Sequence, residues 1–469
     1  MKRLILIVLS LAISFSFAQT GADWPDPAAL TYEPVEFTPP EPIRAELSNG
    51  VVVYLLEDPT LPLVKGTAYI DAPGVLEPAD KVGLASLTAS SLREGGAGDY
   101  SPDDLDEALE TLAASVETSS NQFYASVSFD ALSDNVDDVL ALWADVLIRP
   151  TFDEGRLEVV KGRNLEQVLR TKDDPTQLAV REFFFRVAEG HPSGAYPTEE
   201  SLSSITRADV MDFYESYYAP NVSAVAVTGD FDTQDMLDKL EAVLGNWEPK
   251  DISYPNLPAF DPNPEPKVYY LPKEVAQSTV LVGHPSVLAY SPEYNDLDVA
   301  SQILGNGFSS RLFTEIRTKR GLAYATGSQL GQGFSYPGTF FTFAITNGED
   351  TGQVIDLLLG EIRTLQEGGV TEAELEQRRE TILNRSLFRF TSPAAITERT
   401  ARVGLLGLEP GYYEAYLENV QGITPEEVQA IAQQELKPDE VIIMVVGDAA
   451  LFDRPLEDFG EVITLELDE

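Results

Sequence analysis

The chain has 469 residues, 43% of them hydrophobic and 23% charged, as in an ordinary folded protein of two large domains or about three smaller ones. Its 32 Lys and Arg against 77 Asp and Glu give a formal net charge of −45. This charge argues against nucleic acid as a partner, because binding phosphate requires a cationic surface. No block of like charge dominates the sequence, so we interpret the charge as a solvated acidic surface, typical of salt adaptation, rather than an acidic docking tail.

Cysteine is absent, which excludes disulfides, thiol nucleophiles, Cys-type zinc sites and iron–sulfur clusters. Only two histidines are present, His191 and His284. They are too far apart to lie on one helix, and neither is near a nucleophile-elbow sequence. His191 precedes a proline and is interpreted as a structural turn residue, and His284 is not expected to bind metal.

Residues 1–18 predict a secretory signal peptide. Two cationic residues precede an apolar run over residues 4–17, and small residues mark a cleavage site. The run is shorter than the ~20 residues that a membrane span needs, and no other segment approaches that length. No cysteine follows it to carry a lipid anchor. We therefore expect a soluble exported protein, secreted to the periplasm and beginning near Gln19.

Two proline-rich stretches divide the rest of the chain. Residues 19–43 are predicted to be an extended lead-in. Residues 247–266, WEPKDISYPNLPAFDPNPEP, can neither continue a helix nor lie inside a sheet, and are interpreted as an interdomain linker. The sequence therefore predicts two domains, over residues 44–246 and 267–469.

The two predicted domains resemble each other. Four landmarks recur with a constant offset of 218 residues: Val136 and Val354, Leu157 and Leu375, Ile205 and Ile423, Gly229 and Gly447. Two unrelated amphipathic segments would not keep one register across four landmarks, so we interpret the chain as a duplicated domain.

Strands and helices alternate within each domain. Runs rich in β-branched residues predict strands at 51–56, 124–129, 222–229, 339–345 and 441–447. A helix beginning at Pro102 is predicted by Ser101 as its N-cap, by the proline at its first position and by acidic residues in its first turn. Clusters of strands joined by long helices on one side predict an α+β layer in each of the two domains.

The most distinctive segment is GNGFSSRLFTEIRTKRGLAYATGS, which begins at Gly305. We expect Ser310 to cap a helix over residues 311–320, followed by a strand. Arg317 then lies in the last helical turn and Tyr324 just after the chain reverses. The two side chains can converge on one side, where their donors suit a peptide carbonyl or carboxylate.

This segment and the duplication around it resemble peptidase family M16, the inverted-motif zinc peptidases that include mitochondrial processing peptidase, pitrilysin and insulin-degrading enzyme. GHPSGAYP and ITRADVMDFYESYYAPN are also similar to the family's first domain. The resemblance covers nearly all of the chain after the lead-in. It implies two homologous α+β domains, each an antiparallel-rich sheet with helices packed on one side. Arg317 and Tyr324, in the form R-x6-Y, fall on the family's substrate-contacting pair.

The chain departs from the family at the zinc motif. Active members carry His-x-x-Glu-His, but the matching GLASLTASSL places Ser86, Ala89 and Ser90 where the two histidines and the catalytic Glu would be. Glu166 falls at the family's third ligand position, and a lone carboxylate on a helix is usually solvated. Without imidazoles or a base nothing binds zinc or activates water, so no metal or cofactor is expected in this chain.

The resemblance implies a non-zinc-binding subunit of a heterodimeric M16-type metallopeptidase, inactive alone. It would close over a zinc-bearing M16 partner as half of a peptide-degrading clamshell and supply Arg317 and Tyr324 to peptide substrates. The alternative is a catalytically inert M16-like structural or peptide-binding protein. Arg317 would then be a surface cation at a helix end and Tyr324 a strand aromatic. Catalysis by a pair of carboxylates has no supporting spacing.

The net charge of −45 implies self-repulsion in the folded state, which added salt should relieve. The screening length is already about 8 Å at ~0.15 M salt and shortens further with concentration. We expect the melting temperature to rise with added NaCl, measured by thermal unfolding from low to molar salt. A flat or falling trend would show that the acidic groups are already compensated locally.

Overall fold

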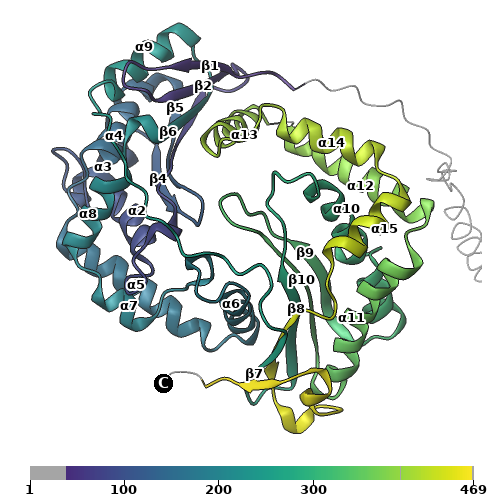
Figure 1. Ribbon diagram of the computed structural model, residues 1–469. Helices are drawn as coiled ribbons and strands as arrows, with labels where there is room; N and C mark the ends of the chain where they lie inside the picture. The colour runs from purple at the N-terminus through teal and green to yellow at the C-terminus, as the bar shows by residue number, and fades with distance from the viewer. Residues whose placement is uncertain (1–38, 391, 467–469) are drawn as a thin grey trace, which may run out of the picture. The chain divides into compact units, whose positions relative to one another are not determined.

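The structure, a computed structural model, describes residues 39–390 and 392–466 (Figure 1). The expected signal peptide, residues 1–18, and most of the lead-in, residues 19–43, lie outside the described residues. The predicted α+β class is confirmed, because the described chain contains two six-stranded sheets with helices packed against them. No helix of the described part combines the length and the apolarity needed to cross a membrane.

The first sheet has the strand order β1-β2-β6-β3-β5-β4, and only β2 and β6 pair in parallel. Its strands are β1 (Ile43–Glu46), β2 (Val52–Glu57), β3 (Leu63–Ile70), β4 (Ser115–Ser120), β5 (Ala125–Leu132) and β6 (Ser223–Gly229). The helices of this half are α2 (Leu84–Glu94), α3 (Pro102–Thr111), α4 (Val136–Ile148), α5 (Glu154–Thr171), α6 (Pro175–Val187), α7 (Glu199–Ser204), α8 (Arg207–Tyr217) and α9 (Thr233–Leu244).

The second sheet has the order β12-β7-β11-β8-β10-β9. Its strands are β7 (Lys267–Pro272), β8 (Gln277–Pro285), β9 (Ala323–Leu330), β10 (Thr339–Asn347), β11 (Ile442–Gly447) and β12 (Val462–Thr464). The helices of this half are α10 (Tyr294–Gly305), the π-helix η6 (Phe313–Lys319), α11 (Thr351–Gly368), α12 (Glu372–Phe390), α13 (Pro393–Leu405), α14 (Tyr412–Gly422) and α15 (Pro425–Glu435).

The predicted duplication is visible in the element boundaries. Three helices of the first half begin 218 residues before their counterparts in the second half: α5 and α12, α6 and α13, α8 and α15. The sheets differ at one edge, where β1 pairs antiparallel with β2 but β12 pairs parallel with β7. The two halves are therefore the same fold with different edge strands.

Strand β11 shows why the sequence of the central strands is apolar throughout. Ile443 and Val445 face one hydrophobic core, which contains residues of α10, α11 and α15. Ile442, Met444 and Val446 face the opposite core, which contains residues of α6. Side chains alternate along a strand, so a strand buried on both faces needs a continuous apolar run.

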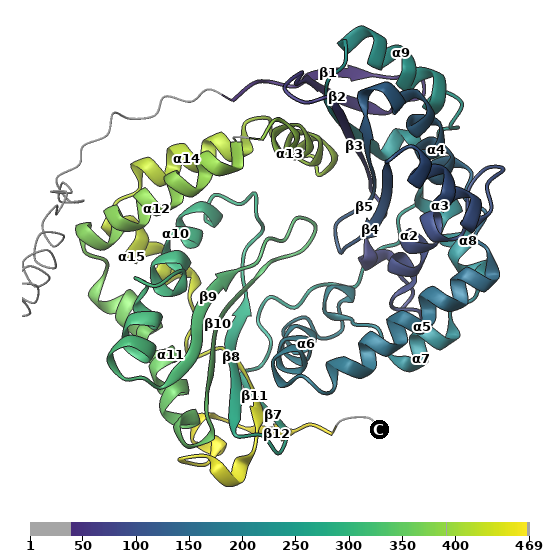
Figure 2. The same ribbon diagram turned by 180° about the vertical axis from the view of Figure 1, so that it is seen from behind.

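The second face of each sheet is covered by a helix from the other half. Helix α6 packs on β8 and β11, and α13 packs on β2, β3 and β6, as Figures 1 and 2 show from opposite sides. Phe183 of α6 is fully buried, with its ring centroid 5.7 Å from that of Phe341. Thr228 of β6 donates a 2.9 Å hydrogen bond to Thr397 of α13. The sequence predicted helices on one side of each sheet and did not indicate this exchange.

A second contact joins loops of the two halves. The β4–β5 loop carries Phe123, whose ring centroid lies 5.1 Å from that of Phe334 and 6.0 Å from that of Tyr336 in the β9–β10 loop. The Tyr336 hydroxyl donates to Oε1 of Gln122 at 2.8 Å. Residues 248–266, within the expected linker, form neither helix nor strand.

Because each half completes the other's core, we expect the two halves to unfold together. Phe183→Ala should lower the free energy of unfolding by about 3–5 kcal/mol, the usual cost of removing a buried Phe side chain. Val180→Ala, at an exposed position of the same helix, should change it by less than about 0.5 kcal/mol. Calorimetry should show one transition for each protein. Two separate transitions, or equal effects of the two variants, would contradict this.

Candidate functional site

The segment after Gly305 forms a helix where the sequence predicts one, but its geometry differs from the expectation. Phe313–Lys319 is a π-helix rather than an α-helix. Ser310 does not cap it through its side chain: its Oγ is buried and has no hydrogen-bond partner among the described residues. Instead, the Ser310 carbonyl accepts the amide hydrogen of Thr314 at 2.9 Å. Single π-helical turns occur frequently at functional sites.

Arg317 and Tyr324 meet, as the sequence analysis expected. The guanidinium carbon of Arg317 lies 5.6 Å from the ring centroid of Tyr324 and 5.0 Å from that of Phe313. Tyr324 stands near the start of β9, at the edge of the second sheet, and 71% of its surface is exposed. The stacking holds the cation in place while its N–H donors and the tyrosine hydroxyl face solvent.

Two aromatic residues of this site were not singled out from the sequence. Phe313 is the second aromatic ring on which Arg317 stacks. Phe308 packs edge-on against the ring of Phe313, with 5.1 Å between the ring centroids. Phe308 is 82% exposed. Its position in a glycine-containing loop is the only sequence signal, because exposure of an aromatic side chain depends on the tertiary structure.

The positions that the sequence analysis compared with the family's zinc motif lie in the other half, on α2. Ser86 is exposed, Ala89 is buried and Ser90 is half-buried. Glu166 lies on α5, where its exposed carboxylate pairs with Arg170 one turn away. No group of three or more metal-ligating side chains occurs within residues 39–390 and 392–466. Hydroxyl and methyl groups are not zinc ligands, so these residues do not fit the family's metal.

Ser86 lines a cavity of about 510 Å³ between α2, α5 and α6. Its other polar lining residues include Asn164 and Gln167 of α5, together with Arg181 of α6. The rest of the lining is largely apolar, with Val168, Val180 and Leu202, so Ser86 lies beside a mainly apolar cavity whose charged group is the Arg181 guanidinium.

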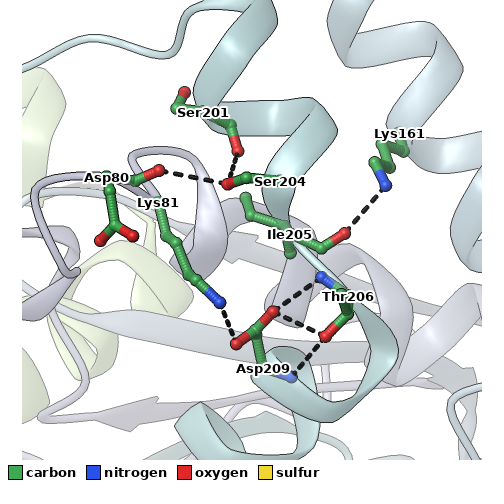
Figure 3. A network of polar contacts seen from close by, with 8 residues as sticks. All are labelled: Asp80, Lys81, Lys161, Ser201, Ser204, Ile205, Thr206 and Asp209. Atoms are coloured by element: carbon green, nitrogen blue, oxygen red, sulfur yellow. Dashed lines mark hydrogen bonds and ion pairs between the residues drawn. The ribbon is translucent and has the colours of Figure 1, made fainter.

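A polar network holds the chain around the start of α2 (Figure 3). Lys81 forms an ion pair with Asp209, and the Asp209 carboxylate also caps α8 by accepting from the amide and hydroxyl of Thr206. The Ser204 hydroxyl donates a hydrogen bond to the carbonyl oxygen of Asp80 at 3.2 Å. These bonds tie the loop before α2 to α7 and α8.

Glu77 caps α2 directly. Its carboxylate accepts the amide hydrogens of Gly83 at 2.9 Å and Ala85 at 2.6 Å. Burial raises the pKa of Glu77 to about 7, although the two hydrogen bonds, which favour the charged carboxylate, lower this pKa in part. The carboxylate satisfies helix N–H groups that otherwise have no partner within the helix.

The two histidines are engaged in the fold. Nδ1 of His191 accepts the amide hydrogen of Ser193 in a short turn. In His284, Nδ1 donates to the carbonyl of Pro285 at 2.7 Å, and Nε2 accepts the amide hydrogen of Lys437 at 3.1 Å. Burial lowers the pKa of His284 to about 4, so the ring is neutral at physiological pH.

The raised pKa of Glu77 makes a pH-dependent contribution to stability. A carboxyl group whose pKa rises from 4.5 to about 7 on folding stabilises the protein most below pH 4.5 and loses that contribution as the pH rises to about 7. We expect the melting temperature of the wild type, relative to Glu77→Gln, to fall across this interval. Thermal melts of both proteins from pH 4 to pH 8 measure it. A constant difference would show that Glu77 has an ordinary pKa.

Comparison with known proteins agrees with this geometry. The family model for insulinase, peptidase family M16, matches residues 52–189 of this chain. The family model for the peptidase M16 inactive domain matches residues 204–382. The chain is 22% identical to the uncharacterized zinc protease YmxG of Bacillus subtilis, over 86% of this chain and 97% of that protein. It is 23% identical to the non-peptidase homolog YmxG of Helicobacter pylori, over 80% of this chain and 87% of that protein.

Among solved structures, a peptidase M16 inactive domain from Pseudomonas fluorescens superposes with a TM-score of 0.81. It is 24% identical, and the alignment covers 88% of this chain and all of that one. This likeness shows the fold. Family models of M16 match residues 52–189 and 204–382, which lie in the two halves of the chain. The chain belongs to peptidase family M16.

Proposed function

We propose that this protein is the non-zinc subunit of a heterodimeric M16-type metallopeptidase. It would form half of a peptide-degrading chamber and contribute Arg317 and Tyr324 to substrate. The observation that carries the proposal is the stacked, solvent-facing Arg317–Tyr324 pair in a chain whose own zinc positions are Ser86, Ala89 and Ser90. An interacting pair of donors, one on the π-helix and one on the edge strand β9, suits a substrate that another subunit cleaves.

The chemistry of the pair supports this role. The Arg317 guanidinium can bind the carbonyl groups of an extended peptide, with its own orientation set by Phe313 and Tyr324. The Tyr324 hydroxyl can donate to the oxyanion that develops when the scissile carbonyl is attacked. The metal of the zinc-bearing partner would supply the activated water. This chain would bind, orient and stabilise, with no base of its own.

The apolar signal sequence of residues 1–18 supports export of the subunit, and we place it in the periplasm. The zinc-bearing partner would have to reach the same compartment. An M16 reading frame with an intact His-x-x-Glu-His and a signal peptide, encoded beside this one, is the expected partner, and co-purification of the native protein identifies it.

A catalytically inert structural or peptide-binding protein is the second candidate. The name of the Helicobacter pylori relative, a non-peptidase homolog, favours it. In that case the exposed Phe308 and Tyr324 would be ordinary surface aromatics or contacts to a structural partner. Activity in the reconstituted complex separates the two candidates.

We expect Tyr324→Phe to lower kcat of the complex with the zinc-bearing partner by about 10²–10³, the usual cost of losing one oxyanion donor. Arg317→Ala, which removes a substrate clamp, should raise KM as well. Both side chains are exposed, so the melting temperature and partner binding should stay close to those of the wild type.

The matched controls are Arg320→Ala and Tyr290→Phe. Arg320 is an exposed cation three residues away that pairs with Glu315, and Tyr290 is an exposed tyrosine. Both controls should leave kcat/KM unchanged. Wild-type kcat/KM in Arg317→Ala and Tyr324→Phe would overturn the assignment and favour the inert protein.

A further inference from the structure

Two arginines of α12 lie against the loop that follows α10. Nη1 of Arg385 donates to Oδ1 of Asn306 at 3.2 Å. Arg378, seven residues earlier on the helix, is only 5% exposed. Its guanidinium lies next to Gly307, because a methyl group added there would lie 3.9 Å from Nη1 of Arg378. Positions seven apart share one face of a helix. The two guanidinium groups therefore meet the same short loop.

Neither arginine has an acidic partner within the described residues. Other arginines in this region do: Arg311 pairs with Glu374, and Arg379 with Glu376. Nε of Arg378 is buried without a hydrogen-bond partner in the described part of the chain. Burial, together with the neighbouring charge of Arg385, lowers the pKa of Arg378. A buried cation without a counter-charge is costly, and it is unexpected in a chain with 77 acidic residues.

Arg385 and Asn306 also line a cavity of about 330 Å³ between α10, β9, α12 and α14. This volume lies in the range of small-molecule sites. The lining is mostly polar, with the amides of Gln329 and Gln332 and the phenols of Tyr412 and Tyr413. The cavity thus offers donors and acceptors beside a positively charged wall.

One acidic group of the cavity limits the charge of the ligand. Asp298 accepts hydrogen bonds from the Tyr416 hydroxyl at 2.5 Å and from Nε2 of Gln302 at 2.7 Å. Its negative charge disfavours a doubly charged anion such as phosphate. A singly charged carboxylate suits the Arg385 guanidinium in the cavity wall, whose planar N–H donors can bind it in a bidentate manner.

We propose that this cavity binds the carboxylate of a small organic ligand, held by Arg385 at its wall, while the buried Arg378 beneath the 306–308 loop adds positive charge nearby without lining the cavity. The carboxylate is either that of a free amino acid or the C-terminal group of a short peptide, since both present the same chemistry. The site is separate from Arg317 and Tyr324 and does not depend on the proposed function.

Calorimetric titration of the full chain with four probes tests the proposal: trialanine, trialanine amide, alanine and inorganic phosphate. We expect trialanine or alanine to bind, and whichever binds more tightly identifies the source of the carboxylate. Trialanine amide and phosphate should bind at least tenfold more weakly than that ligand. Equal affinity for the acid and its amide, equal affinity for phosphate, or no binding of either carboxylate at millimolar concentration would overturn the proposal.

Three variants locate the site. Arg385→Gln, at an exposed position, should weaken carboxylate binding at least tenfold. Arg363→Gln is the matched control, because Arg363 is a surface arginine of α11 paired with Asp439, and it should bind as the wild type does. Wild-type affinity in Arg385→Gln would overturn the proposal.

Arg378→Met tests the buried cation separately. It should raise the melting temperature of the ligand-free protein, because it removes an uncompensated buried charge and keeps the apolar volume. It should also reduce the rise in melting temperature that the carboxylate causes in the wild type, because the positive charge near the cavity is lost. A lower melting temperature with unchanged ligand-induced stabilisation would show that Arg378 is structural, and would remove it from the site.

Discussion

Each sheet of this protein has two apolar faces, and its own half of the chain covers only one of them. Burying the second face is favourable by roughly 25 cal/mol for each Å² of apolar surface removed from water. Helix α6 provides that cover for the second sheet, and α13 provides it for the first. This exchange makes each half a part of the other's core, and the remaining arrangement of the molecule depends on it.

The exchange is built from equivalent pieces of the duplicated chain. Both helices begin with a side-chain cap followed by proline, Asp174 before Pro175 and Ser392 before Pro393. The faces they meet differ. Helix α13 packs on a surface that contains the small residues Ala224 and Ala226, whereas α6 packs on large side chains such as Phe341. The α13 surface also contains the rings of Tyr54 and Tyr69, so the two equivalent contacts are filled by different sets of side chains.

Helix α2 carries Ser86, Ala89 and Ser90, the positions that the sequence analysis compared with the family's zinc motif. The start of this helix is held by the Glu77 carboxylate and by the Lys81–Asp209 ion pair. Ser86 lines a largely apolar cavity that also contains the side chains of Asn164, Gln167 and Arg181.

In so acidic a chain, arginines that have no acidic partner in the described part of the structure stand out. Arg317 is held by aromatic rings at the surface, and Arg378 is buried next to another arginine. The first presents its donors to solvent, while the second lies under a loop next to a polar cavity. Stacking costs a cation little solvation, but burial costs it much more. The two sites therefore suit different ligands, an extended peptide backbone and a compact anion.

The sequence by itself determined the α+β class, the duplication and the main strands, because these follow from local periodicity and from a register kept over 218 residues. It also placed Arg317 beside Tyr324, since a helix end and the following strand bring residues seven apart together. Tertiary structure alone decided the exchange of α6 and α13, because either apolar helix face would suit either sheet. It likewise decided the π-helical geometry of Phe313–Lys319 and the meeting of Arg385 with Asn306, which lie 79 residues apart. Contacts over such separations depend on how whole elements pack, and no local pattern encodes them.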